Sequence, residues 1–269
     1  VRRVSNGTPV DVQTHGGSIR LRLTVFWTLG PGPSAIEAAT NQLAAMRSSG
    51  LLDRADAIYV SGDDFNRDAS DIRNSTAINW RRSTDIADQP WFHLIRALAA
   101  PGVAAKLKMV PTEIRQWYNA RNRSFEFPAL EAAWDVCRRA NRPSAVIYIH
   151  TKGSTYASPT LTDPFESPRH WKIFAWRQIL NHYTIVDYES CVRNLELGYA
   201  TCGALLTWES ESEATHAKAV LWPHYSGNYF WARCDYISAG LPSPRPDVSD
   251  LRPNKRHSPF GLRATGRWL

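Results

Sequence analysis

The sequence predicts one α/β domain, built on an open mixed sheet with helices on both faces. Strand-like and helix-like patterns alternate along the first half of the chain, as they do in such sheets. The run from Ala145 to Ile149 is almost wholly apolar, which is typical of a strand buried on both faces. The 269 residues suffice for one large domain with a full core.

The first predicted strand runs from Ile19 to Trp27, where apolar and polar side chains alternate. The Gly30-Pro31-Gly32-Pro33 segment that follows predicts a turn. Ser34 and Glu37 then have the spacing of a capping box, which predicts the start of a helix. Gly50 predicts the end of that helix.

The later elements are predicted by the same signals of periodicity and chain breakers. They are, in order, a strand at 56–61, a short helix at 90–100, a strand at 107–110, a helix at 127–140, the apolar strand at 145–149, a Pro/Ser/Thr-rich loop at 154–169, helices at 170–182 and 185–197, a strand at 202–208 and a last helix at 230–239. Thr184, three residues before Asp187, is expected to cap the helix at 185–197.

The net charge of +7 lies at the two ends of the chain, in residues 1–22 and 245–269, so that residues 23–244 are neutral overall. We therefore expect an N-terminal extension at 1–18, a folded domain at 19–242 and a basic C-terminal tail at 243–269. A nucleic-acid-binding protein concentrates basic residues on its folded body. The charge distribution argues against a nucleic-acid partner.

The four cysteines, Cys137, Cys191, Cys202 and Cys234, show no Cys-x-x-Cys spacing. Buried free thiols are the expectation, with a bridge between Cys191 and Cys202 left open. No apolar stretch is long enough to predict a membrane span. The compartment stays open between the cytoplasm and, if an upstream anchor precedes this fragment, the Golgi lumen.

The candidate site lies where predicted strands end. His150, Thr151, Lys152 and Gly153 leave the buried strand at its carboxyl end, and ligands of open α/β sheets bind at such ends. Lys152 offers a fixed positive charge, His150 is a donor or a metal ligand, and Gly153 permits close approach of a backbone. This set suits a diphosphate, the other interpretation being a strand that simply reaches solvent.

Further candidates follow other predicted strands and helices. Asp63 and Asp64 come after the strand at 56–61 and are expected to meet a nucleoside, although such a pair also occurs in ordinary turns. Glu209 is the candidate general base, the alternative being a solvated acidic loop. Arg177 is placed to grip a phosphate. A polar loop suited to a sugar or phosphate contains His224, Ser226, Gly227 and Asn228.

Four segments carry a resemblance to a known family: Glu126 to Leu130 with Trp134, Val146 to Gly153, Trp176-Arg177, and His224 to Trp231. Over residues 20–242 the chain resembles glycosyltransferase-like proteins of surface-polysaccharide synthesis, and is similar to the rhamnan-synthesis type. The resemblance implies a GT-A-type fold, which is a Rossmann-like nucleotide-sugar domain. It also implies a nucleotide-sugar donor, a glycan acceptor and transfer of a hexosyl or deoxyhexosyl group.

One departure from common GT-A enzymes concerns the metal. Those enzymes place an Asp-x-Asp after the strand that follows such a helix, whereas this chain has His150-Thr151-Lys152 there. Lys152 is expected to neutralise the diphosphate directly, so no metal ligand is assigned, and a need for Mn²⁺ or Mg²⁺ stays open. The alternative function is a catalytically silent GT-A-like domain that binds glycans or nucleotides. A serine hydrolase is disfavoured because Gly-x-Ser-x-Gly is absent.

Overall fold

The computed structural model describes residues 20–30, 34–62, 101–119, 126–151, 168–207, 224–225, 228–241 and 243–245. The predicted helix at 90–100, residues 154–167 of the predicted loop, the extension at 1–18 and all but three residues of the basic tail lie outside these ranges. The last two residues of the predicted loop, 168 and 169, are helical. No helix in the described ranges has the length and apolar character needed to cross a membrane.

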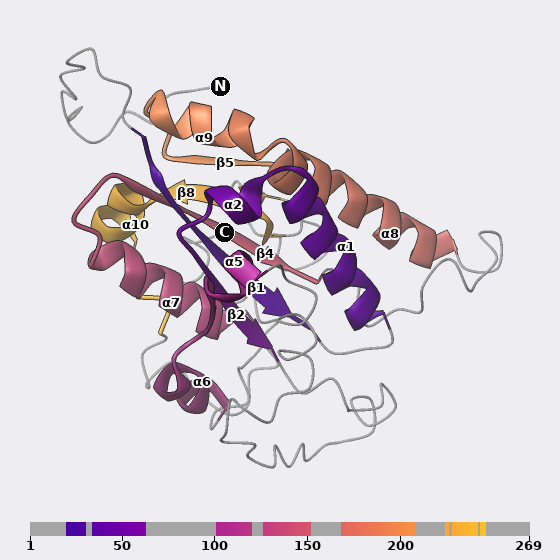
Figure 1. Cartoon of the computed structure of the whole chain (residues 1–269), viewed down its shortest axis with the longest axis horizontal. Coiled ribbons are helices and arrows are strands. Elements are labelled where there is room, and N and C mark those ends of the chain that lie inside the picture. Colours follow the sequence, from indigo (N-terminus) through magenta and orange to yellow (C-terminus); the bar gives the residue numbers. More distant parts are fainter. Residues whose placement is uncertain are drawn as a thin grey trace, which may run out of the picture.

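A mixed sheet forms the centre of the molecule (Figure 1). Among the described residues its strand order is β3-β2-β1-β4-β8-β5. The strands are β1 (Arg22–Leu29), β2 (Ala57–Gly62), β3 (Leu107–Met109), β4 (Ser144–His150), β5 (Thr201–Gly203) and β8 (Phe230–Arg233). Strands β1 to β4 all run parallel to one another, and β8 runs antiparallel to both β4 and β5. β4 is therefore central, as its apolar sequence predicts.

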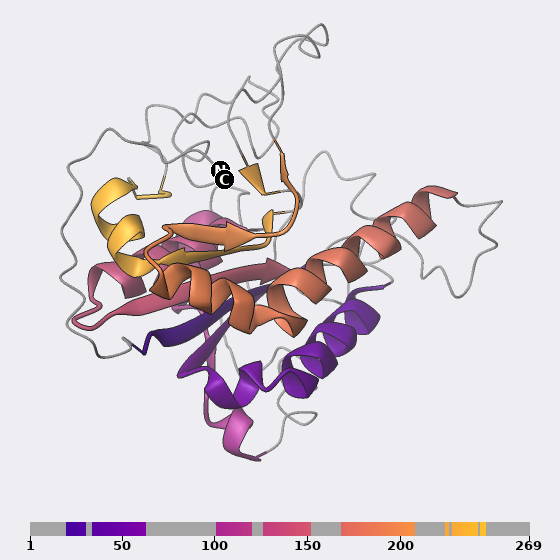
Figure 2. The ribbon, with the colours of Figure 1, turned by 90° about the horizontal axis from the view of Figure 1, so that it is seen from above.

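Helices cover both faces of the sheet (Figure 2). One face packs against α1 (Ala35–Ser48), α2 (Leu51–Arg54), the end of α8 (Pro168–Asn181), the π-helical turn η3 (His182–Val186) and α9 (Tyr188–Glu196). The other packs against α6 (Thr112–Asn119), α7 (Phe127–Arg138) and α10 (Cys234–Gly240). The short helix α5 (Pro101–Ala104) precedes β3, and a small ribbon pairs β6 (Leu206–Thr207) with β7 (His224–Tyr225). The predicted two-sided α/β domain is confirmed.

The alternation of side chains along β4 explains this double burial. Ala145, Ile147 and Ile149 belong to the core beneath α1 and α9, whereas Val146 and Tyr148 belong to the core beneath α7 and α10. A strand with period-2 side chains needs apolar residues at every position when both faces are covered.

The helix predicted at 230–239 is wrong in its first half. Residues 230–233 form strand β8, and only Cys234–Gly240 is helical. Trp231 is fully buried, and its indole donates a hydrogen bond to the carbonyl of Thr184 at 2.9 Å. The apolar side chains of residues 230–233 show no clear helical or strand periodicity, so burial beside β4 decides their conformation.

Two helix caps also differ from expectation. Ser34 stands at the N-cap of α1 but makes no side-chain capping hydrogen bond. Thr184 lies inside η3, where its hydroxyl donates to the Leu180 carbonyl at 2.6 Å, so Asp187 takes the N-cap position of α9. The predicted strand at 202–208 is split into β5 and β6 around Leu205, whose φ is 51°.

The expectation of free thiols is wrong as well. Cys137 of α7 is bonded to Cys234 of α10, and Cys191 of α9 is bonded to Cys202 of β5. The second bridge, whose partners are 11 residues apart, is the one that the sequence left open. The first joins residues 97 apart, a proximity that only the packing of α7 against α10 creates.

Candidate functional site

The candidate site lies where the direction of the strand order reverses. From β1 the chain proceeds outward to β2 and β3, and then returns to place β4 on the other side of β1. In open α/β sheets ligands bind outside the carboxyl ends of the strands at such a switch point. Here β1 ends at Leu29 and β4 ends at His150, with Thr28 and His150 paired across the two strands.

Polar groups replace apolar ones at this edge. The Thr28 and Ser61 hydroxyls, at the ends of β1 and β2, are hydrogen bonded at 3.1 Å. The Thr151 N–H donates to the Thr28 carbonyl at 3.0 Å, and the Thr151 hydroxyl accepts from the Gly30 N–H at 2.6 Å. Thr151 thereby fixes the chain as it leaves both β1 and β4, so the switch point has a defined shape.

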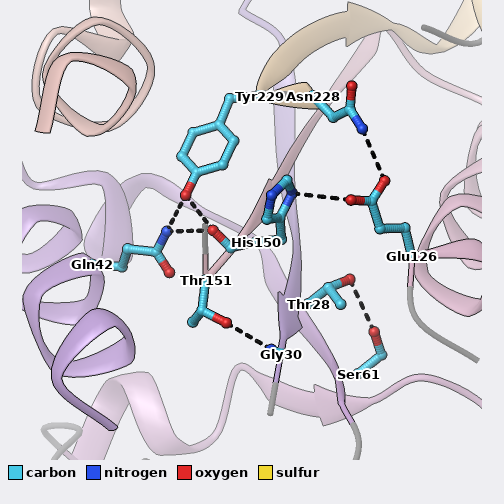
Figure 3. A network of polar contacts seen from close by, with 9 residues as sticks. All are labelled: Thr28, Gly30, Gln42, Ser61, Glu126, His150, Thr151, Asn228 and Tyr229. Carbon is cyan, nitrogen blue, oxygen red and sulfur yellow. Dashed lines mark hydrogen bonds and ion pairs between the residues drawn. The ribbon is translucent and has the colours of Figure 1, made fainter. Parts of the chain in front are cut away.

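Gln42 of α1 joins this edge to the helix layer (Figure 3). Its side-chain oxygen accepts from the Trp27 indole at 2.7 Å, and its side-chain nitrogen donates to the His150 carbonyl at 2.8 Å. The Tyr229 hydroxyl donates to the same carbonyl and accepts from Gln42. A buried polar network of this kind rigidifies its members when their hydrogen bonds are made.

Glu126 approaches the His150 ring from the α7 side of the sheet (Figure 3). Its Oε1 lies 3.5 Å from His150 Nδ1, and its Oε2 accepts from the Asn228 amide at 3.0 Å. All three side chains are buried. Three segments far apart in the sequence therefore meet at the carboxyl end of β4.

Tyr148 lies two residues before His150, on the same face of β4. Burial raises the pKa of its hydroxyl well above the ordinary value, and the Glu126 charge adds to that rise while the Thr28 hydroxyl opposes it. The phenol is therefore neutral at physiological pH. The Tyr148 ring lies beside the His150 ring, with 6.0 Å between the ring centroids.

Arg177 sits apart from this group, between α8 and the first turn of α1. Its guanidinium is buried and lies 3.4 Å from the Glu37 carboxylate, and it also stacks over the Phe174 ring. Burial lowers the pKa of Arg177, and the Glu37 charge counteracts that shift. In the structure Arg177 forms an internal ion pair with Glu37. The phosphate contact predicted for Arg177 stays a prediction.

The structure thus brings together His150, Thr151 and Asn228 of the predicted site residues. His224 is placed only as part of the backbone of β7. The other predicted residues lie outside the described ranges: Asp63, Asp64, Lys152, Gly153, Glu209, Ser226 and Gly227.

Sequence reasoning missed Glu126, Gln42 and Tyr229 as members of the site. Glu126 stands directly before a predicted helix and was visible as a carboxylate at a helix start. Gln42 and Tyr229 carried no signal, because a buried polar contact depends on which elements pack together. Asn228 has a left-handed φ of 59°, which Asn adopts more readily than most residues do.

The described residues contain no group of three or more His, Cys, Asp or Glu side chains placed to hold a metal ion. The predicted acidic pair, Asp63 and Asp64, follows β2 directly in the sequence and lies outside the described residues.

Comparison with known proteins gives one family. A family model described as a domain of unknown function, DUF8361, matches residues 103–246, more than half of the chain. No curated protein matches the chain. The matched range includes Glu126, His150, Thr151 and Asn228, whereas β1, α1 and β2 precede it.

Proposed function

We propose that this chain, which belongs to DUF8361, a family of domains of unknown function, is a glycosyltransferase with a GT-A-like fold. It moves a sugar from a nucleotide-sugar donor to a hydroxyl group of a glycan or another acceptor. The observation that carries the proposal is the switch point between β1 and β4, bordered by polar groups from β1, α1, β4, α7 and the start of β8.

The strand order supports a nucleotide as the ligand. The order β3-β2-β1-β4 is that of the first strands of dinucleotide-binding Rossmann sheets, in which the phosphates lie beside the first strand–helix turn. In this chain the sequence between β1 and α1 includes Gly30 and Gly32, and the N-terminus of α1 carries a partial positive charge.

The residues after β4 supply the proposed chemistry. Lys152 follows Thr151, which is fixed at the switch point. In this proposal the Lys152 ammonium stabilises the charge that develops on the leaving diphosphate. Gly153, Ser226 and Gly227 contact the donor through backbone and hydroxyl groups, and Asp63 and Asp64 after β2 contact the nucleoside. Glu209 takes the proton of the acceptor hydroxyl.

A direct test is calorimetric titration with nucleoside diphosphates and their sugar conjugates, with and without Mn²⁺. We expect at least one to bind with a dissociation constant between about 1 μM and 1 mM, the usual range of enzyme–substrate affinities. Replacing Thr151 by valine removes the acceptor for the Gly30 N–H, and we expect it to weaken binding about tenfold, the scale of one lost hydrogen bond.

Ser190→Ala is the matched control, because it also removes one hydroxyl but from an exposed position on α9. It should leave the affinity unchanged. The proposal fails if no nucleotide or nucleotide sugar binds, or if Thr151→Val binds as tightly as the unaltered chain. Turnover of the bound donor, with or without an acceptor, separates an enzyme from a silent binding domain.

A further inference from the structure

We infer that Glu126 is a positioning residue of this site: its carboxylate holds the His150 imidazole with the proton on Nδ1, which makes Nε2 the acceptor nitrogen. The part that Nε2 plays in turnover rests on the proposed function, whereas the orientation of the ring follows from the geometry. The inference adds to the site a carboxylate that stands 24 positions before His150 in the sequence.

Both carboxylate oxygens of Glu126 are directed into the site. Oε1 faces His150 Nδ1 at 3.5 Å, and Oε2 accepts from Asn228 at 3.0 Å. Glu126 is 7% exposed and His150 is 3% exposed, so water screens their interaction weakly. Burying a carboxylate costs free energy unless the charge is paired. The contacts of Glu126 with His150 and Asn228 offset that cost.

The position of Glu126 in the fold argues against a purely local role. It occupies the N-cap of α7, a place where a carboxylate stabilises free N–H groups, yet its side chain makes no capping hydrogen bond. The carboxylate instead lies between His150 of β4 and Asn228, which stands two residues before β8. Both of these contacts are with residues of the site.

The backbone of His150 is held from the opposite face of the sheet. Gln42 and Tyr229 both donate to its carbonyl, and the Tyr229 ring meets the His150 ring edge to face at 5.2 Å. With the backbone and the ring plane fixed, the contact with Glu126 decides which nitrogen bears the proton.

The 3.5 Å contact is an ion-pair distance without hydrogen-bond geometry, so its effect is electrostatic. An ionised carboxylate oxygen attracts an N–H and repels a nitrogen lone pair, so the nitrogen that faces it carries the proton. In the neutral imidazole one nitrogen donates and the other accepts, and the partner of one sets the role of the other. Glu126 thus selects the Nδ1–H tautomer and makes Nε2 the acceptor nitrogen of the ring. Carboxylates play the same part behind catalytic and metal-bound histidines.

The test is the imidazole nitrogen NMR spectrum of the whole chain, with the His150 signals assigned by their loss in His150→Gln. We expect Nδ1 to be protonated in the unaltered chain. Glu126→Gln preserves shape and can still accept from Asn228, but its amide can donate to Nδ1. The proton of neutral His150 should therefore move to Nε2.

Glu131→Gln is the matched control, because Glu131 is a second buried carboxylate on α7 that pairs with Arg245 instead of His150. It should leave the His150 signals unchanged. A His150 that carries its proton on Nε2 in the unaltered chain, or that keeps one tautomer in both variants, overturns the inference.

A second readout concerns turnover. Loss of a partner that orients a ligating or catalytic group typically costs 10–100-fold in activity. We expect Glu126→Gln to lower kcat by about tenfold or more while KM changes little. A chain in which the tautomer shifts but no nucleotide binds would contradict the proposed function and uphold the role of Glu126. If nucleotide binds but the tautomer is the same in Glu126→Gln as in the unaltered chain, the proposed function stands and the role of Glu126 is contradicted.

The paired cysteines carry an independent inference, that this chain folds and works in an oxidising compartment. All four cysteines of the sequence are in bridges, and three of them are at most 3% exposed. The first bridge joins α7 to α10 across 97 residues, and the second joins α9 to β5, the next element along the chain. Structural disulfides persist in a secretory lumen, a periplasm or the cell exterior and are rare in reducing cytoplasm.

Each bridge forms when two thiols lose two protons and two electrons, which a disulfide-bearing oxidoreductase accepts by thiol–disulfide exchange. The test is acid trapping of the protein in its own cells, followed by alkylation before and after reduction and mass measurement. We expect no cysteine to react before reduction and all four to react after it. Alkylation of any cysteine in most molecules before reduction overturns the inference.

Discussion

Replacing Lys152 by alanine is expected to lower the rate of sugar transfer by about 10²–10³ while the protein stays folded, because removing one preorganised electrostatic partner costs that much in other enzymes. Thr151 is anchored by the Thr28 carbonyl and the Gly30 N–H, so the residue directly before Lys152 is fixed at the switch point. In the proposed function, the Lys152 ammonium stabilises the departing diphosphate without a metal. The measurements are kcat with a nucleotide-sugar donor and a thermal melt of each variant.

Lys108→Ala is the matched control, since it removes a lysine from β3 at the edge of the sheet. Its turnover should equal that of the unaltered chain. Chelators should also have little effect on the unaltered chain. If Lys152→Ala stays within about threefold of the unaltered rate, well short of the electrostatic expectation, Lys152 is simply a lysine at a strand end. Abolition of activity by a chelator alone would assign the diphosphate charge to a metal.

Replacing both Cys137 and Cys234 by alanine is expected to destabilise the fold by about 4–5 kcal/mol, the chain-entropy value for a loop of about 100 residues. The two cysteines are 97 residues apart and enclose β4 and the whole segment from α8 to β8. Without the bridge, the unfolded chain regains the freedom of that loop. At this chain length the loss corresponds to a fall in melting temperature on the order of 10 °C, measured by calorimetry without reductant.

The pair Cys191 and Cys202 provides the comparison, because it closes a loop of only 11 residues. Its double alanine variant should lose less, about 3 kcal/mol. Adding reductant to the unaltered chain should reproduce the sum of both losses, and adding it to the quadruple variant should change nothing. Equal melting temperatures for the Cys137/Cys234 variant and the unaltered chain would show that this bridge contributes no stability.

The sequence alone determined the elements whose signals are local. The apolar run at 145–149 predicted a central strand, because only a strand covered on both faces needs apolar side chains at consecutive positions. The helix at 127–140 followed from its apolar periodicity and from Pro128 in its first turn. The polar exit at His150 and Thr151 followed from the same run, because carboxyl ends of parallel strands share one edge.

Tertiary structure decided what depends on partners distant in the chain. Residues 230–233 became a strand because β4 offered an edge to pair with, and Cys137 met Cys234 because α7 packs on α10. The contact of Glu126 with His150 and Asn228 has the same origin. Periodicity reports which face of one element is buried, but not which other element covers it, so side chains that meet across elements become visible only when the fold brings them together.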